Sequence, residues 1–557
     1  MSQYEQIDAD VLIIGGGSAG AMAAVHAKEL NPHARVVVFE KGQIRYSGSI
    51  PRGMDALNIV AVPGVATPED YVVATKAACE EVVDETTSYV MAQRSWDLLH
   101  KLESWGVYFP RDKQGSYEVL KVHSKGRFAV TMREPELKVI LAERLANLGC
   151  TVFNRTMAVD LLMEDGEVRG ALGLNVRTGE LLACRAKAVI LSAGGIARFG
   201  LPDNGYLYGI FDCPANTGDT YALSYRAGAE LTGLEYTTNA YIVKDVNAPL
   251  LYITLTRGGQ LLNALGQTPQ SDHPSTTMMM DEHRQDRAPL FIRMSHLPHE
   301  KIDEIEDILF STERPVLQRF FEGRGVNFRT RDIELGPTEF FLCGGHGITG
   351  VAVDETAAAT VPGLYAAGDA ANVGRGHLTG AFVFGELAVE SAYSQRANAD
   401  LTSDVAGAVA AFTRKRQALE NNAGSVGVDE FEYKVRRGIN NYVVPPKNEV
   451  KLNRALETMG YLRRDLAEQV HVKSVSELVK ALEVENIITC AVLSTHASLE
   501  RKESRWGFYH YRADYPTKQA YWDQHVAVRK GEVEEQVLAA PRPIARLRPT
   551  SEQGRGN

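Results

Sequence analysis

Cysteine is scarce in this sequence. The 557 residues include six cysteines, and no two of them form a C-x-x-C pair. Such spacing provides no recognisable iron–sulfur or structural zinc motif and no disulfide framework. We therefore expect no metal site in this chain and interpret the cysteines as small buried apolar residues.

Long apolar runs and an excess of positive charge are also missing. No run approaches the length of a membrane span, so we expect none. The formal net charge is -10, and no basic arm with interleaved aromatic residues appears, which disfavours nucleic-acid binding. The first residues lack the basic start and apolar stretch of a secretory signal, so we expect a cytoplasmic protein.

The remaining composition is that of an ordinary globular protein. Hydrophobic residues make up 44% of the chain and charged residues 23%. A chain of 557 residues is too long for one hydrophobic core, so two or three domains are expected.

Glycine is concentrated in a motif near the N-terminus. An apolar strand precedes Gly15, and Gly15, Gly17 and Gly20 have the G-x-G-x-x-G spacing of a dinucleotide-binding turn. Ser18 and Ala19 would begin a helix whose free N–H groups face phosphate. Alone, this spacing also fits a glycine-rich turn that binds nothing, but the flanking strand and helix favour a dinucleotide.

An acidic residue stands where a ribose would lie. Glu40 ends the second apolar strand, twenty residues beyond Gly20, and would accept hydrogen bonds from ribose hydroxyls. An acid at this place favours FAD or NAD over NADP. The spacing does not choose between FAD and NAD.

Several later segments repeat the change from strand to glycine or small residues. The loop after Glu40 would run along a cofactor, and Asp369 follows a strand and suits a ribityl hydroxyl. The further cofactor-binding candidates in these segments are Lys41, Ser47, Gly48, Gly53, Ala193, Gly194, Thr217, Asp219, Gly368, Thr379 and Ala381.

The pattern predicts an α/β fold. We expect a Rossmann-type FAD-binding or NAD-binding domain with an inserted α+β capping domain and a helical C-terminal domain. The expected divisions are 1–235 and 341–395 for the nucleotide-binding domain, 236–340 for the capping domain, 396–535 for the helical domain and 536–557 for an extended tail.

The chain resembles the succinate dehydrogenase and fumarate reductase flavoprotein family, which also contains aspartate oxidase and the alpha subunit of dissimilatory adenylylsulfate reductase. The resemblance spans nearly the whole chain. It rests on Gly15-Gly-Gly-Ser-Ala-Gly20, Ala193-Gly-Gly195, Thr217-Gly-Asp219, Gly344-Gly-His346 and Gly363-Leu-Tyr-Ala-Ala-Gly-Asp369. Arg45-Tyr-Ser-Gly-Ser, Asp286-Arg-Ala-Pro-Leu-Phe-Ile and the run from Arg501 to Pro516 are most similar to the adenylylsulfate reductase branch.

This resemblance implies FAD and a partner. Succinate dehydrogenases attach FAD to a histidine, whereas Ser47-Gly48-Ser49 stands at that place here, which implies non-covalent FAD. The adenylylsulfate reductase branch pairs the flavin chain with a small ferredoxin-like iron–sulfur subunit, which agrees with the scarce cysteines. A homo-oligomer or hetero-oligomer is equally expected.

The resemblance also places four candidate catalytic residues beside the flavin: Asn58, Arg257, Arg287 and His346. Two expected arginines are missing. Leu255 stands where fumarate reductases have a proton-donating arginine, and Ile242 where the sulfate branch has a substrate arginine, with Lys244 near it.

The resulting hypothesis is an FAD-dependent oxidoreductase acting on a small anionic substrate and exchanging electrons with an iron–sulfur partner, as adenylylsulfate reductase does. Two alternatives remain. One is a fumarate reductase-like or aspartate oxidase-like enzyme acting on a small carboxylate. The other is a non-catalytic flavin electron-transfer subunit, because a fold does not prove an active site.

Overall fold

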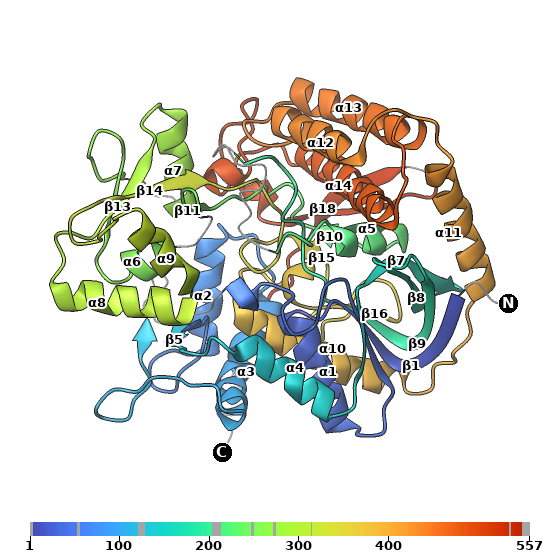
Figure 1. Ribbon diagram of the computed structural model, residues 1–557, viewed down its shortest axis with the longest axis horizontal. Helices are drawn as coiled ribbons and strands as arrows, with labels where there is room; N and C mark the ends of the chain where they lie inside the picture. Colours follow the sequence, from blue (N-terminus) through green and yellow to red (C-terminus); the bar gives the residue numbers. More distant parts are fainter. Residues whose placement is uncertain are drawn as a thin grey trace, which may run out of the picture.

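The computed structural model describes residues 4–52, 56–120, 129–202, 213–246, 250–270, 275–313, 315–533 and 536–547. Of the predicted site residues, Gly53 lies outside these ranges. Figure 1 shows a nucleotide-binding domain, a capping domain beside it and a helical domain packed above it.

A seven-stranded sheet forms the framework of the nucleotide-binding domain, in the order β6-β2-β1-β9-β8-β7, with β16 also paired to β9. The strands are β1 Tyr4–Ile14, β2 Val36–Glu40, β6 Thr151–Asn154, β7 Thr156–Glu164, β8 Glu167–Asn175, β9 Leu181–Leu191 and β16 Leu364–Ala366. β1 runs parallel to β2 and β9, and β16 runs parallel to β9. The loops that follow these strands therefore meet at one edge of the sheet. The predicted α/β class is confirmed.

Helices from both nucleotide-binding segments surround this sheet. They are α1 Ser18–Leu30, α2 Pro68–Ala78, α3 Glu85–Ser104, α4 Leu137–Asn147, α5 Asp219–Arg226 and α10 His377–Arg396. α1, α5 and α10 contact its strands, α3 and α4 pack on α10 and α1, and α2 packs on α3. α1 and α10 can approach closely because Gly385 on α10 has no side chain. A Cβ at this position would lie only 2.6 Å from the Ala19 carbonyl oxygen. A small sheet in the order β3-β5-β4 (Ala56–Leu57, Ala129–Thr131, Val119–Leu120) lies beside them.

The capping domain has its own sheet and hydrophobic core. The antiparallel sheet runs β11-β14-β13-β12, with Met279, Ile292 and Leu317 in the core beside it. The elements are β11 Tyr241–Val243, α6 Leu251–Leu255, β12 Gln260–Leu262, α7 Ser275–Arg284, β13 Leu290–Arg293, α8 His299–Asp307, a π-helix at Ile308–Glu313, α9 Pro315–Gly323 and β14 Ile333–Pro337. The predicted α+β insertion is thus present.

The C-terminal domain contains more β-structure than the sequence suggested. Its helices are α11 Val405–Glu420, α12 Val428–Tyr442, α13 Glu449–Glu468 and α14 Val475–Glu500. They are followed by β17 His525–Lys530 and β18 Val537–Arg542, which join β10 Leu231–Thr232 and β15 Gly350–Val351 in a sheet ordered β15-β10-β17-β18. No helix in the described part of the chain is long and apolar enough to cross a membrane.

The described part of the proline-rich tail is bound to the rest of the protein. Pro541 is tolerated in β18 because this strand is at the edge of the sheet. Beyond it, the Ala545 amide donates to Asp84 Oδ1 over 2.6 Å, and Arg546 forms a 2.7 Å ion pair with Glu85. The tail expected at 536–557 is therefore a paired strand and a docked segment as far as residue 547.

An ionic cluster joins α1, α3 and α10 and predicts a pH-dependent stability. Glu390 accepts from Arg94 at 2.7 Å and lies 3.1 Å from His26 Nε2. The His26 hydrogen bond and the Arg94 guanidinium lower the Glu390 pKa from 4.5 to about 2. Because the folded pKa is depressed, this carboxylate stabilises the protein above pH 4.5, and the stabilisation is lost as the pH falls toward 2.

We expect Glu390→Gln to lower the thermal unfolding midpoint at pH 7 and to match the original protein more closely as the pH falls below 4.5. The measurement is thermal unfolding followed by circular dichroism across pH 3–7. Glu457→Gln is the matched control because Glu457 pairs with Arg454 on an exposed face. A Glu390→Gln deficit that grows on acidification would contradict the prediction.

Candidate functional site

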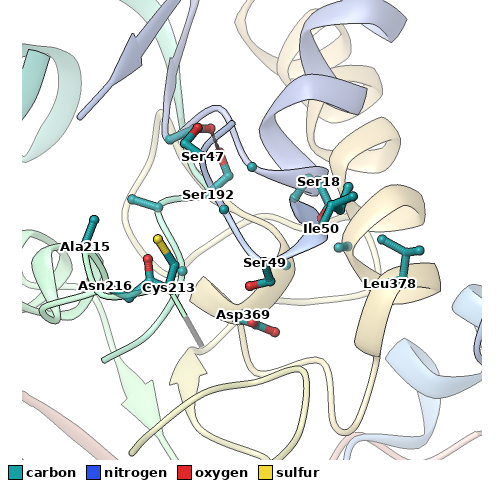
Figure 2. Close-up of a pocket in the computed structure, with 18 of the residues that line it drawn as sticks. Ser18, Ser47, Ser49, Ile50, Ser192, Cys213, Ala215, Asn216, Asp369 and Leu378 are labelled. Carbon is teal, nitrogen blue, oxygen red and sulfur yellow. Dashed lines mark hydrogen bonds between the residues drawn. The ribbon is translucent and has the colours of Figure 1, made fainter. Parts of the chain in front are cut away.

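One large cavity lies at the sheet edge where the parallel strands end. Its volume is about 720 Å³, within the range of ligand pockets. Figure 2 shows Ser18, Ser49, Cys213 and Asp369 among the side chains around it. The predicted site residues that line it are Gly15, Gly17, Ser18, Ala19, Glu40, Lys41, Ser47, Gly48, Asn58, Ala193, Gly194, Asp219, His346, Gly368, Asp369 and Ala381.

The glycines of the first motif are required by close backbone contacts. Gly15 has φ +99°, and a Cβ there would lie 2.5 Å from the Ala193 Cα. A Cβ at Gly20 would lie 1.9 Å from the Gly15 carbonyl oxygen, so Gly20 shapes the turn from behind the cavity. Gly17 is the N-cap of α1 and offers no side-chain cap. The first N–H groups of α1 therefore remain available for an anion in the cavity.

Glu40 holds the glycine turn and faces the cavity. Its two carboxylate oxygens accept from the Gly16 and Gly42 amides, at 2.8 and 2.6 Å. A carboxylate has further lone pairs, so it can also accept from ribose hydroxyls. Lys138 on α4, which the sequence did not single out, donates to the Gly16 carbonyl from the other side. Burial lowers the pKa of Lys138 to about 8.

Lys41 and Asp219 form a buried ion pair at the cavity wall. Lys41 Nζ lies 2.9 Å from Asp219 Oδ2 and 2.6 Å from Glu483 Oε1. Burial opposes charge on both groups, but their mutual attraction raises the Lys41 pKa and lowers the Asp219 pKa. Thr217 lies behind them, accepting from Lys41 at 3.1 Å and donating to Asp219 at 2.9 Å. Thr217 thus orients the pair without lining the cavity.

The pair is the first link of a buried charge chain with alternating signs. In order, the chain is Lys41, Glu483, Arg198, Glu432, Arg436 and Glu339. Glu432 sits at its centre, 2.6 Å from Arg198 and 3.1 Å from Lys480. Burial raises the pKa of Glu432, but the cations beside it lower the pKa overall. This buried charge chain connects the cavity, through α14 and α12, to the segment that follows β14.

Two histidine rings are in edge-to-face contact at another part of the cavity. The rings of His346 and His377 have centroids 5.0 Å apart and planes at 75°. Both residues line the cavity together with Asn58. Thr379, on the first turn of α10, donates to the Asn58 carbonyl oxygen and so fixes the Asn58 loop. Thr379 was expected at the cofactor, and in this structure it lies behind the loop.

The two arginines expected beside the flavin are not among the residues that line the cavity, and each is paired with a glutamate. Arg257 pairs with Glu304 at 3.0 Å, and Arg287 donates to Glu282 over 2.7 Å. Lys244 likewise pairs with Glu334 at 2.7 Å. None of the three is among the residues that line this cavity. The sequence indicated that the capping domain has these cations, but it did not indicate which carboxylates would form ion pairs with them.

Comparison with known proteins decides the family. Residues 10–381 match the FAD binding domain family, and residues 433–550 match the fumarate reductase flavoprotein C-terminal family. The chain belongs to the succinate dehydrogenase and fumarate reductase flavoprotein family. The predicted FAD cofactor is confirmed, which settles the choice that Glu40 left open.

Relatives match along nearly their whole length. A fumarate reductase (CoM/CoB) subunit of Methanothermobacter marburgensis is 25% identical over 95% of this chain and 98% of its own. L-aspartate oxidase of Pseudomonas aeruginosa is 26% identical over 93% of this chain and 97% of its own. The structure of adenylylsulfate reductase from Archaeoglobus fulgidus has a TM-score of 0.88 and 22% identity, covering 98% of this chain and 97% of that one.

The cavity fits FAD by its own contacts. Ser47 Oγ is buried and has no hydrogen-bond partner among the described residues. A bound flavin nucleotide would supply one, because unpaired buried polar atoms are costly. A Cβ at Gly345 would lie 1.9 Å from Asp369 Oδ1, so glycine is needed for Asp369 to take its place at the wall. FAD would be held by the α1 N-terminus, Glu40, Ser47 and Asp369.

Several residues that line the FAD cavity were not predicted from the sequence. Asn216 packs on the glycine turn after β9, since a Cβ at Gly194 would lie 2.6 Å from its Nδ2. Arg375 also lines the cavity, two residues before His377. The signal in the sequence that could have indicated Arg375 is the run Arg375-Gly-His before α10, which places a cation and an imidazole on either side of a glycine.

Proposed function

We propose that this protein is the flavoprotein subunit of an oxidoreductase that binds FAD non-covalently, acts on a small anionic substrate and exchanges electrons with a separate ferredoxin-like iron–sulfur subunit. The observation that carries the proposal is the His346 and His377 pair, which lines the same cavity as the glycine turn. FAD supplies the redox chemistry when bound. The imidazoles would hold a substrate oxyanion or donate a proton to it, and Asn58 would orient it.

The capping-domain wall favours a sulfur oxyanion as the first substrate class to test. Ile253, Leu255 and Thr256 line the cavity on this side. The fumarate reductase pattern has a proton-donating arginine at the place of Leu255, and leucine cannot donate a proton. An adenylylsulfate reductase-like reaction, for which bound FAD would supply the reducing equivalents, does not require that arginine.

Reduction or oxidation of a small carboxylate is the second candidate. It is supported by the aspartate oxidase and the fumarate reductase that match along nearly the whole chain. The iron–sulfur partner is supported by the chain's own scarcity of cysteine, which leaves single-electron transfer to another polypeptide.

The proposal can be tested with the FAD-loaded protein. Acid precipitation should release the flavin into the supernatant, because no histidine stands at Ser47-Gly48-Ser49. The flavin, reduced anaerobically, should then be reoxidised by adenylylsulfate or, for the second candidate, by fumarate or iminoaspartate. His346→Gln and His377→Gln should each slow this step by about 100-fold if the imidazole transfers a proton.

Failure of every anion to reoxidise the flavin would contradict catalysis and support an electron-transfer subunit. Flavin that remains in the acid precipitate would contradict non-covalent binding. Co-purification from the native host, with iron analysis, tests the partner independently. Rapid reoxidation by oxygen with no iron-containing partner would overturn that part of the proposal.

A further inference from the structure

One peptide group in the glycine turn is held from one side only. The peptide group before it, between Gly15 and Gly16, is held from both sides. Its amide donates to Glu40 over 2.8 Å, and its carbonyl accepts from the Ser192 hydroxyl over 2.8 Å. The peptide group that joins Gly16 to the next glycine has a single partner among the described residues, since its carbonyl accepts from Lys138 and its amide is not bonded. Lys138 is therefore the hydrogen-bond donor that fixes the direction of this peptide group.

The free amide of that peptide group is the Gly17 N–H, which points away from Lys138. No peptide bond in the turn is cis, and in a trans peptide group the carbonyl and the N–H point in opposite directions. Gly17 lines the cavity and is the N-cap of α1, whose first N–H groups are also available to an anion there. By holding the carbonyl from behind, Lys138 adds the Gly17 N–H to the donors at the N-terminus of α1.

The position of Lys138 suits this role. It lies in the first turn of α4, which packs on α1, and it is 2% exposed. Burial lowers the pKa of Lys138 to about 8, against the attraction of Glu40, so the ammonium group is still charged at neutral pH. A charged donor forms a stronger hydrogen bond to a carbonyl than a neutral one, and a buried side chain has little freedom to leave it.

We propose that Lys138 is a positioning residue for FAD, which holds the Gly16 carbonyl so that the Gly17 N–H is directed at the pyrophosphate. The recognised group is the pyrophosphate because its charged oxygens gain most from an oriented N–H donor at a helix N-terminus. This inference concerns how the cofactor is held, so it does not depend on the substrate or on the iron–sulfur partner of the proposed function.

The first test is the dissociation constant of FAD, measured by dilution of the FAD-loaded protein and separation of the free flavin by ultrafiltration. Lys138→Met should raise this constant by about 30-fold, because it removes a charged hydrogen bond and leaves the carbonyl without its partner. Lys138→Gln, which keeps an uncharged donor on a shorter side chain, should raise it by about 10-fold. The glutamine variant also provides the measurement if methionine prevents folding.

Lys28→Met is the matched control. Lys28 is a buried lysine that also donates to a backbone carbonyl, that of Pro32 at 3.1 Å, but it is not among the residues that line the cavity. This variant should leave the FAD dissociation constant unchanged. Phosphorus NMR of the FAD-saturated proteins gives a second readout. The pyrophosphate resonances should shift in Lys138→Met and not in Lys28→Met, whereas the visible absorption of the flavin should be the same in both.

A double-variant cycle separates this role from an indirect effect through Glu40. Lys138 holds a carbonyl that Glu40 does not contact, so Lys138→Met should still weaken FAD binding by about 10-fold or more in the Glu40→Gln background. Loss of the effect in that background would overturn the proposal. A Lys138→Met protein with the original dissociation constant and phosphorus resonances would also overturn it. Neither result depends on turnover, so a failure of the proposed function would be seen separately, as normally bound FAD that no anion reoxidises.

Discussion

Gly15→Ala is expected to remove FAD from the protein. At φ +99° an alanine is strained by about 1–2 kcal/mol, and its Cβ would also meet Ala193 Cα at 2.5 Å. The three atoms nearest to this Cβ, which belong to Ala193 and Ser192, are all backbone atoms, so β1 and the turn after β9 must separate, which opens the wall that binds the pyrophosphate. We expect FAD affinity to fall by more than about 100-fold, corresponding to roughly 3 kcal/mol. The measurement is fluorescence titration of the apoprotein with FAD.

Gly106→Ala separates backbone strain from steric overlap. Gly106 has a similar φ of +94°, but no atom lies within 4 Å of the Cβ that alanine would add. This variant should lose some stability and keep its FAD. Gly15→Ala protein that retains FAD with unchanged affinity would show that the contact with Ala193 does not shape the site.

Glu432→Gln is expected to cause the largest loss of stability. Glu432 is the central anion of the buried charge chain, and its removal leaves Arg198, Arg436 and Lys480 short of one negative charge. Breaking a buried ion pair from one side typically costs about 3–5 kcal/mol, because the remaining charge stays desolvated. Thermal unfolding of the FAD-loaded protein should show a correspondingly lower midpoint.

The exposed pair Arg454 and Glu457 on α13 provides a comparison for this prediction. Glu457→Gln removes the same charge from a pair whose members are more than half exposed, so it should cost about 1 kcal/mol or less. Equal midpoints for Glu432→Gln and Glu457→Gln would mean that water reaches the buried chain. In that case its charges would not hold the helical domain to the cavity.

The parts of the fold that could be predicted from the sequence are those with a local cause. The glycine turn depends on residues a few positions apart, and Glu40 could be recognised because it ends the apolar strand that follows that turn. The alternating strands and helices indicated the α/β class for the same reason, because periodicity is a local property.

Features that depend on distant partners could not be predicted. Arg198 and Glu483 are 285 positions apart, and no local pattern indicates that they meet. Arg257 has the residue type of a substrate ligand, but Glu304 on α8 determines where it points.

The last described residues also limit when the protein can complete folding. Ala545 binds Asp84 across 461 positions, so these groups leave the ribosome far apart in time. Until β18 emerges, β17 is an open edge, which is a template for association with other chains. The contacts of Asp84 and Glu85 with this segment can therefore form only after Ala545 and Arg546 have been synthesised. A chain that stops short of β18 would be prone to aggregate as well as less stable.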